Sequence, residues 1–131
     1  MALPILIVDD EPIVRESIRD WLKETGYTVL TAENGEQALE ILNHREVGVI
    51  VLDIRLPGRT GISILREIRE KKPLIQSIII TAYPSSDLTA EALKLGALDY
   101  LVKPIIPDDL EKLVREAVRK YELTKGGGYE R

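Results

Sequence analysis

Three short apolar runs constrain the fold of this 131-residue chain more than any other feature. They lie at residues 5–8, 47–52 and 78–80, and none of them alternates between apolar and polar side chains. Runs of this length, rich in Val and Ile and without alternation, are typical of strands that are buried on both faces. Parallel strands covered by helices on both sides provide such burial, so the runs predict an α/β sheet.

Amphipathic segments separate these runs. The first begins near Pro12, presents Val14, Ile18 and Leu22 on one face, and ends at Gly26. Two further strands are expected at about 28–32 and 99–102, and four further helices at about 35–43, 62–73, 87–95 and from 107 onward. We therefore expect a five-stranded parallel sheet flanked by five helices, the flavodoxin-like, doubly wound (βα)5 arrangement.

The sequence indicates one folded domain over residues 1–122, followed by a flexible tail or linker remnant over 123–131 that contains Gly126, Gly127 and Gly128.

The net charge is −4 with no basic cluster, which argues against direct nucleic acid binding. A chain with no cysteine and one histidine has no disulfide framework and poor ligands for zinc. No apolar run approaches the roughly 20 residues of a membrane span, and no targeting peptide precedes the first strand, so a cytoplasmic location is expected.

Acidic residues follow two of the apolar runs. Asp9 and Asp10 come after the first run and Asp53 after the second. Because the carboxyl ends of parallel strands meet at one edge of a sheet, the three carboxylates should lie together and repel one another. Carboxylate oxygens suit Mg2+, which usually takes one or two of them and keeps several waters. Capping of the first helix by Asp9, Asp10 and Glu11 is the alternative, but no cap explains Asp53.

Lys103 and Thr81 end two other predicted strands at the same edge. Lys103 either extends to solvent, as lysines beside a core strand normally do, or pairs with Asp53 and binds a phosphoryl oxygen as a point charge. The Lys103–Pro104 bond is one that adopts the cis form at low cost. Thr81 is either a simple turn residue or a hydroxyl that reaches a phosphoryl oxygen.

The combination of these residues resembles the response-regulator receiver family, the CheY-like phosphoacceptor domains of two-component signalling. The resemblance runs from about Leu3 to Tyr121. It is carried by the segments IVDDE at 7–11, LDIRLPG at 52–58, ITA at 80–82 and GALDYLVKP at 96–104.

The resemblance implies a metal site and a phosphoacceptor. Asp53 is expected to accept the phosphoryl group and to bind Mg2+. Asp10 is expected to bind Mg2+ directly, and Asp9 directly or through water. The backbone carbonyl of Arg55 is expected to be a further ligand.

The resemblance also assigns the remaining residues at this edge. Lys103, the Thr81 hydroxyl and the Ala82 backbone N–H are expected to bind the phosphoryl group, and Tyr100 with Thr81 to form the switch. The implied function is Mg2+-dependent transfer from a phosphohistidine of a sensor histidine kinase, or a phosphotransfer protein, to Asp53. Such a domain promotes its own phosphorylation and dephosphorylation and is not an enzyme in the usual sense. Phosphorylation of Asp53 is expected to alter a surface on helix four, strand five and helix five. After phosphorylation this surface would bind an output domain, a target protein or a second copy of the domain.

The chain departs from the commonest family pattern at four places. Arg59 and Thr60 replace a frequent Met-Asp pair, and Ile105 replaces a frequent Phe. Arg55 is large and basic beside the expected phosphoryl group, which leaves the dephosphorylation rate open. Leu98 stands where some DNA-binding subfamilies carry an acid used in dimer salt bridges, which puts that mode of dimerisation in doubt.

Three other functions remain as alternatives. A receiver-like scaffold that is never phosphorylated would share the fold, but all the expected site residues are present. A phosphatase of the haloacid-dehalogenase type would need a second acid two residues after Asp53, where this chain has Arg55. A flavodoxin-like cofactor binder would need a phosphate-binding loop after the first strand, where Asp9, Asp10 and Glu11 would repel a phosphate. There is also no P-loop sequence.

Overall fold

Five strands alternate with five helices in the computed structural model, which describes residues 3–125. The strands are β1 Ile5–Val8, β2 Val29–Ala32, β3 Val49–Asp53, β4 Gln76–Thr81 and β5 Asp99–Val102. The helices are α1 Pro12–Glu24, α2 Gly35–His44, α3 Gly61–Lys71, α4 Asp87–Lys94 and α5 Pro107–Lys125.

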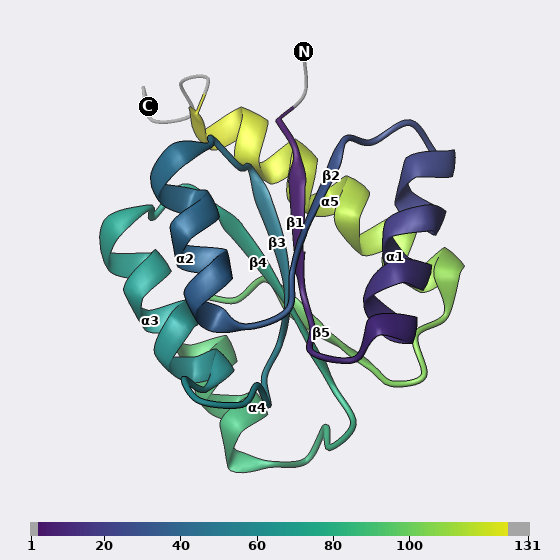
Figure 1. Cartoon of the computed structure of the whole chain (residues 1–131). Helices are drawn as coiled ribbons and strands as arrows, with labels where there is room; N and C mark the ends of the chain where they lie inside the picture. Colours follow the sequence, from purple (N-terminus) through teal and green to yellow (C-terminus); the bar gives the residue numbers. More distant parts are fainter. Residues whose placement is uncertain (1–2, 126–131) are drawn as a thin grey trace.

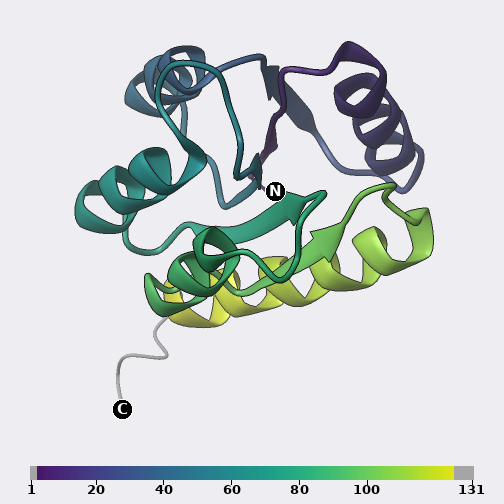
Figure 2. The same cartoon turned by 90° about the horizontal axis from the view of Figure 1, so that it is seen from below.

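The strands form one parallel sheet in the order β2-β1-β3-β4-β5. Helices α1 and α5 cover one face of the sheet, and α2, α3 and α4 cover the other, as Figures 1 and 2 show from two directions. This arrangement confirms the predicted doubly wound α/β fold with its five strands and five helices.

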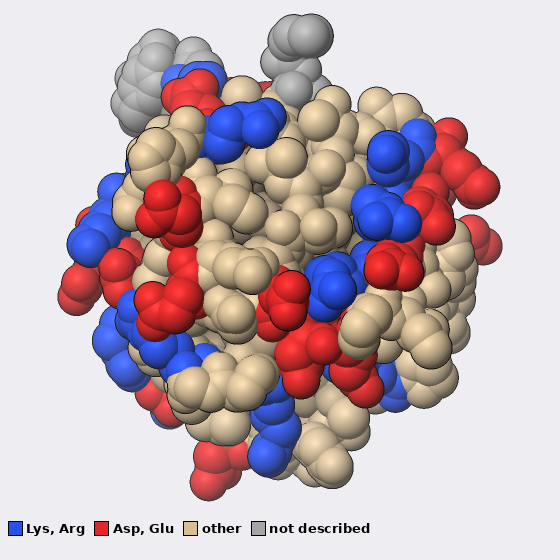
Figure 3. Space-filling view, in the orientation of Figure 1, with Lys and Arg blue, Asp and Glu red and all other residues tan. Residues whose placement is uncertain are grey.

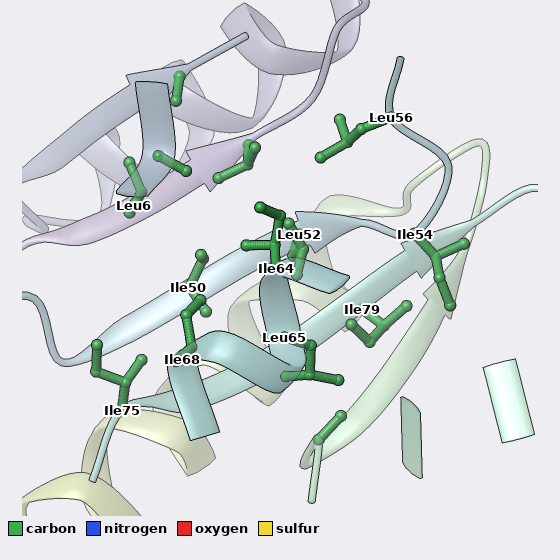
Figure 4. Packing of buried hydrophobic residues seen from close by; sticks show 14 of the residues in the cluster. Leu6, Ile50, Leu52, Ile54, Leu56, Ile64, Leu65, Ile68, Ile75 and Ile79 are labelled. Atoms are coloured by element: carbon green, nitrogen blue, oxygen red, sulfur yellow. The ribbon is translucent and has the colours of Figure 1, made fainter. Parts of the chain in front are cut away.

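The core has two layers because successive residues of each strand point to opposite faces of the sheet. One layer, against α2, α3 and α4, contains Leu6, Val8, Ile50, Leu52 and Ile79 from the strands. Figure 4 shows several of these packed against Ile64, Leu65 and Ile68 of α3. The other layer, against α1 and α5, contains Ile5, Ile7, Val49, Val51, Ile78 and Ile80. Burial of both faces explains why the apolar runs do not alternate.

Two element boundaries differ from the sequence-based expectation. Strand β4 begins at Gln76 rather than near residue 78, because Gln76 and Ser77 are buried strand residues that an apolar pattern does not reveal. Helix α5 continues to Lys125, so the expected domain boundary at 122 falls within a helix. Residues 123–125, which the sequence places in the predicted tail, belong to this helix, since no Gly or Pro interrupts the helical segment before Gly126. The rest of the predicted tail, 126–131, lies outside the described residues.

The register of the strands places the polar residues at one edge. Val8 lies opposite Leu52, Asp53 opposite Ile80, and Thr81 opposite Val102. Asp9, which follows β1, therefore emerges beside the end of β3, and Lys103, which follows β5, emerges beside the end of β4. The sequence order of the strands thus brings residues from four separate segments to a single site.

Candidate functional site

The three predicted acids lie together at the carboxyl edge of the sheet. Ligand atoms of Asp9, Asp10 and Asp53 all lie within 4.8 Å of one another. Asp9 is fully buried and Asp53 nearly so, whereas Asp10 is exposed. Figure 3 shows acidic side chains gathered where β1 ends in the orientation of Figure 1. The cluster is therefore open to solvent on the side of Asp10 and enclosed on the side of Asp9.

Asp9 is fixed by contacts around its own backbone. Its N–H donates to the carbonyl of Ala32 at 3.2 Å, and its carbonyl accepts a bond from Arg15 Nη1 at 2.8 Å. Its Oδ1 accepts the Glu11 N–H at 2.9 Å, whereas the buried Oδ2 makes only an ion pair with Lys103 at 3.1 Å. Glu11 occupies the N-cap of α1, as the capping alternative expects, but its side chain makes no capping hydrogen bond and pairs with Lys103 instead.

Lys103 neutralises part of this charge. Its Nζ lies 2.8 Å from Asp53 Oδ2, 2.8 Å from Glu11 Oε1 and 3.1 Å from Asp9 Oδ2. The side chain is only 16% exposed, so it does not extend to solvent, and the predicted pair with Asp53 is present. The Lys103–Pro104 peptide bond is cis. The sequence does not predict the contact with Glu11, which lies in a loop between β1 and α1.

Burial and charge shift two pKa values in this cluster. Burial raises the pKa of Asp9 above its ordinary value, and repulsion from Asp53 adds to this, against the lowering effects of the Glu11 N–H and Lys103. Burial alone would lower the pKa of Lys103, but hydrogen bonds to Asp53 and Glu11 outweigh it and raise this pKa above that of a free lysine. Lys103 is therefore a permanent cation at neutral pH.

The remaining predicted residues surround Asp53 on the side of β4. The Arg55 N–H donates to Asp53 Oδ1 at 2.9 Å, while the Arg55 side chain is exposed. Thr81 is buried, and its Oγ1 accepts the N–H of Tyr83 at 2.9 Å. Ala82 is exposed at the start of the following loop. Residues 81–83 therefore form a tight turn beside the acid cluster.

Tyr83 is a residue of the site that the sequence does not predict. Tyr83 is 57% exposed, and its ring lies under the guanidinium of Arg55, with 4.7 Å between Arg55 Cζ and the ring centre. Tyr100, the predicted switch residue, lies on β5 and is partly buried against the layer that contains α2, α3 and α4. It is thus placed away from the acids, one strand beyond Thr81.

The donors in this cluster fit a hard divalent cation. All three are carboxylates, and the buried Asp9 Oδ2 has only the 3.1 Å ion pair with Lys103. A carboxylate oxygen can accept more than one partner, so this oxygen could also bind a metal ion. Mg2+ matches the few carboxylates and the open side toward solvent better than Ca2+, which takes six to eight oxygen ligands.

Asp10→Ala is expected to remove Mg2+ binding with little effect on the fold, because Asp10 is exposed and bound to no other side chain among the described residues. Calorimetric titration measures the affinity. Mg2+ at 100 times its dissociation constant should raise the free energy of unfolding of the wild type by about 2.7 kcal/mol and leave the variant unchanged. Asp109→Ala, which removes an exposed acid of α5, is the matched control. Equal affinities in wild type and Asp10→Ala would contradict this assignment.

Comparison with known proteins places this geometry in a family. The family model of the response regulator receiver domain matches residues 5–115. The chain is 41% identical over 125 residues to the transcriptional regulatory protein ZraR of Klebsiella oxytoca, with 92% of this chain and 27% of that protein covered. It is 34% identical to a cyclic di-GMP phosphodiesterase of Thermotoga maritima, with 89% of this chain and 31% of that protein covered.

Solved structures agree with these matches. A CheY-like receiver domain protein from Methanospirillum hungatei superposes with a TM-score of 0.88 at 29% identity, covering 93% of this chain and 98% of that one. NtrX from Brucella abortus superposes with a TM-score of 0.92 at 29% identity, covering all of this chain and 30% of that one. The chain spans between about a quarter and a third of the length of its curated relatives.

Within residues 3–125, no helix has the length and apolar character needed to cross a membrane. The matched residues include every strand and all the acids of the cluster. By sequence and by fold, this chain belongs to the response regulator receiver family of two-component signalling.

Proposed function

We propose that this domain accepts a phosphoryl group on Asp53 and converts it into a change at a protein-binding surface. The observation that carries the proposal is the setting of the Asp53 carboxylate. It lies at the end of the central strand, with Oδ2 on Lys103 at 2.8 Å and Oδ1 on the Arg55 N–H at 2.9 Å, beside two further carboxylates. Among the described residues, Asp9 and Asp53 both combine a strand end, a contact with Lys103 and a place in the candidate metal cluster, but only Asp53 lies at the end of the central strand.

The chemistry follows from this setting. One carboxylate oxygen of Asp53 attacks the phosphorus of a phosphohistidine on a sensor histidine kinase or a phosphotransfer protein. The O–P bond forms as the N–P bond breaks, and the electron pair of that bond stays on the imidazole nitrogen. Mg2+ held by Asp9, Asp10, Asp53 and the Arg55 carbonyl would offset charge on the transferring group.

Residues of this chain orient the group and hold it. Lys103, already charged and 2.8 Å from Asp53, is positioned to pair with a phosphoryl oxygen. The Ala82 N–H is a further donor at the same edge. The Thr81 hydroxyl now accepts the N–H of Tyr83 but can turn to donate to a phosphoryl oxygen. Asp9 is the less accessible nucleophile, because its side chain is fully buried whereas that of Asp53 is 6% exposed.

We further propose that the signal passes to the surface formed by α4, β5 and α5. Thr81 pairs in register with Val102 of β5, and Tyr100 lies on the same strand and is partly buried. A shift of Thr81 toward Asp53 would leave space that the Tyr100 ring can occupy, which changes the surface around β5. The surface would then bind an output domain, a target protein or a second copy of this domain. The domain would act as a phosphoacceptor that promotes its own phosphorylation and dephosphorylation, not as an enzyme that acts on free substrates.

Asp53→Asn is expected to abolish phosphoryl uptake, because an amide is not a nucleophile toward phosphorus under these conditions. The test is intact-mass spectrometry after incubation with acetyl phosphate and Mg2+. Wild type should gain one phosphoryl group, and this gain should disappear when EDTA removes the metal. Asp99→Asn, which removes an exposed acid from the opposite end of β5, should behave as wild type. The proposal fails if wild type gains nothing, or if Asp53→Asn gains the same adduct.

A further inference from the structure

Arg55 and Tyr83 join the two loops at the mouth of the site. Arg55 follows β3 and Tyr83 follows β4, and the guanidinium carbon lies 4.7 Å from the centre of the ring. This is within the range of a favourable cation–π contact. Both side chains are exposed, so the contact forms a bridge over the surface and is not a consequence of core packing.

Each partner in this bridge is also bound to a residue that is expected to meet the phosphoryl group. The Arg55 N–H donates to Asp53 Oδ1 at 2.9 Å, and the Tyr83 N–H donates to Thr81 Oγ1 at 2.9 Å. Three contacts therefore connect Asp53 to Arg55, Arg55 to Tyr83, and Tyr83 to Thr81. A new charge on Asp53 or a movement of Thr81 would therefore affect the contact between Arg55 and Tyr83.

The positive charge of Arg55 makes its contact with Tyr83 open to replacement by a contact with a phosphoryl group. Lys103 forms ion pairs with three carboxylates, whereas Arg55 makes no ion pair with any residue in the range 3–125. A phosphoryl group adds negative charge and strong acceptor oxygens two residues from Arg55. A guanidinium binds such oxygens in a bidentate manner, and these bonds are stronger than an exposed cation–π contact.

We propose that the Tyr83 ring and the phosphoryl group on Asp53 compete for the Arg55 side chain. In the unphosphorylated form, the stack holds Arg55 away from Asp53 and keeps Tyr83 where its N–H engages Thr81. Phosphorylation draws Arg55 off the ring, which frees Tyr83 and lets the Thr81 hydroxyl turn. The stack is thus a restraint that favours the resting form, and by linkage its removal strengthens binding of the phosphoryl group. This inference rests on the proposed role of Asp53.

The experiment measures the affinity for beryllofluoride, a phosphoryl mimic, by calorimetry with Mg2+ present. Tyr83→Ala is expected to bind it about two- to five-fold more tightly than wild type, the effect of losing one exposed cation–π contact. Tyr83→Phe keeps the ring and should match wild type. Arg55→Ala loses the charge-assisted bonds and should bind about ten-fold more weakly.

The double variant Arg55→Ala/Tyr83→Ala decides between competition and independent effects. Under competition, Tyr83→Ala changes nothing once Arg55 is absent, so the double variant matches Arg55→Ala. If Tyr83→Ala tightens binding equally in both backgrounds, or has no effect in either, the competition is refuted while the role of Asp53 stands. Absence of beryllofluoride binding in wild type would refute both.

Discussion

Lys103→Ala is expected to lower the free energy of unfolding by about 3 kcal/mol at neutral pH without Mg2+. Lys103 is the only cation that pairs with Asp9 and Asp53 among the described residues. Its loss leaves two buried carboxylates with backbone hydrogen bonds but without a cation, and protonation of Asp9, whose pKa is already raised, recovers only part of the lost stability. Urea unfolding followed by circular dichroism measures the change.

Mg2+ provides the internal control for this effect. A divalent cation at the cluster replaces the missing charge, so it should stabilise Lys103→Ala more than wild type. Lys120→Ala removes an exposed lysine of α5 and should change the free energy of unfolding little. Equal stability of Lys103→Ala and wild type without Mg2+ would show that the three ion pairs do not contribute to folding.

Gly61→Ala is expected to destabilise the protein by about 2 kcal/mol and to weaken Mg2+ binding. A Cβ at this position would lie 2.5 Å from the carbonyl oxygen of Asp53 and 2.6 Å from the Cα of Ile54. These are backbone atoms of the segment that carries the acid, so the strand end must shift. Alanine is otherwise favoured over glycine in a helix by about 1 kcal/mol, so destabilisation would show that the close approach dominates.

Gly35→Ala is the matched control, since it also begins a helix. There the new Cβ would meet the end of the Ile64 side chain at 2.5 Å, which can change its rotamer. We expect a smaller loss of stability and unchanged Mg2+ affinity, measured by urea unfolding and calorimetry. The close packing of α3 on the end of β3 is expected to position Asp53. A Gly61→Ala variant that is as stable as wild type and binds Mg2+ with the same affinity would refute this.

The fold and the acid cluster were predictable because one physical rule governs both. Strands buried on both faces must be apolar throughout, so Asp9 and Asp53 mark the points where β1 and β3 leave the core. Parallel connections then bring these points to one edge. The same rule placed Lys103 and Thr81, and the structure brings Lys103 into contact with both acids.

The contacts that sequence reasoning missed depend on side-chain directions within loops. Glu11 precedes α1 and could equally have pointed to solvent, yet it reaches Lys103 at 2.8 Å. Tyr83 follows a strand by two residues, and nothing local predicts that its ring lies under Arg55. The sequence predicts too short an α5. The last turn of this helix buries no side chain, and Leu123 is exposed there, so no apolar pattern marks where the helix ends.

The central claim is that Asp53, and no other acid of the cluster, carries the phosphoryl group. Borohydride reduces an acyl phosphate to an alcohol, so treatment of the phosphorylated protein converts the modified aspartate to homoserine. Peptide mapping by mass spectrometry then locates the change. Homoserine is expected at position 53 alone, in amounts that depend on Mg2+. Homoserine at position 9 or 10, or no conversion at 53 in protein shown to be phosphorylated, would contradict it.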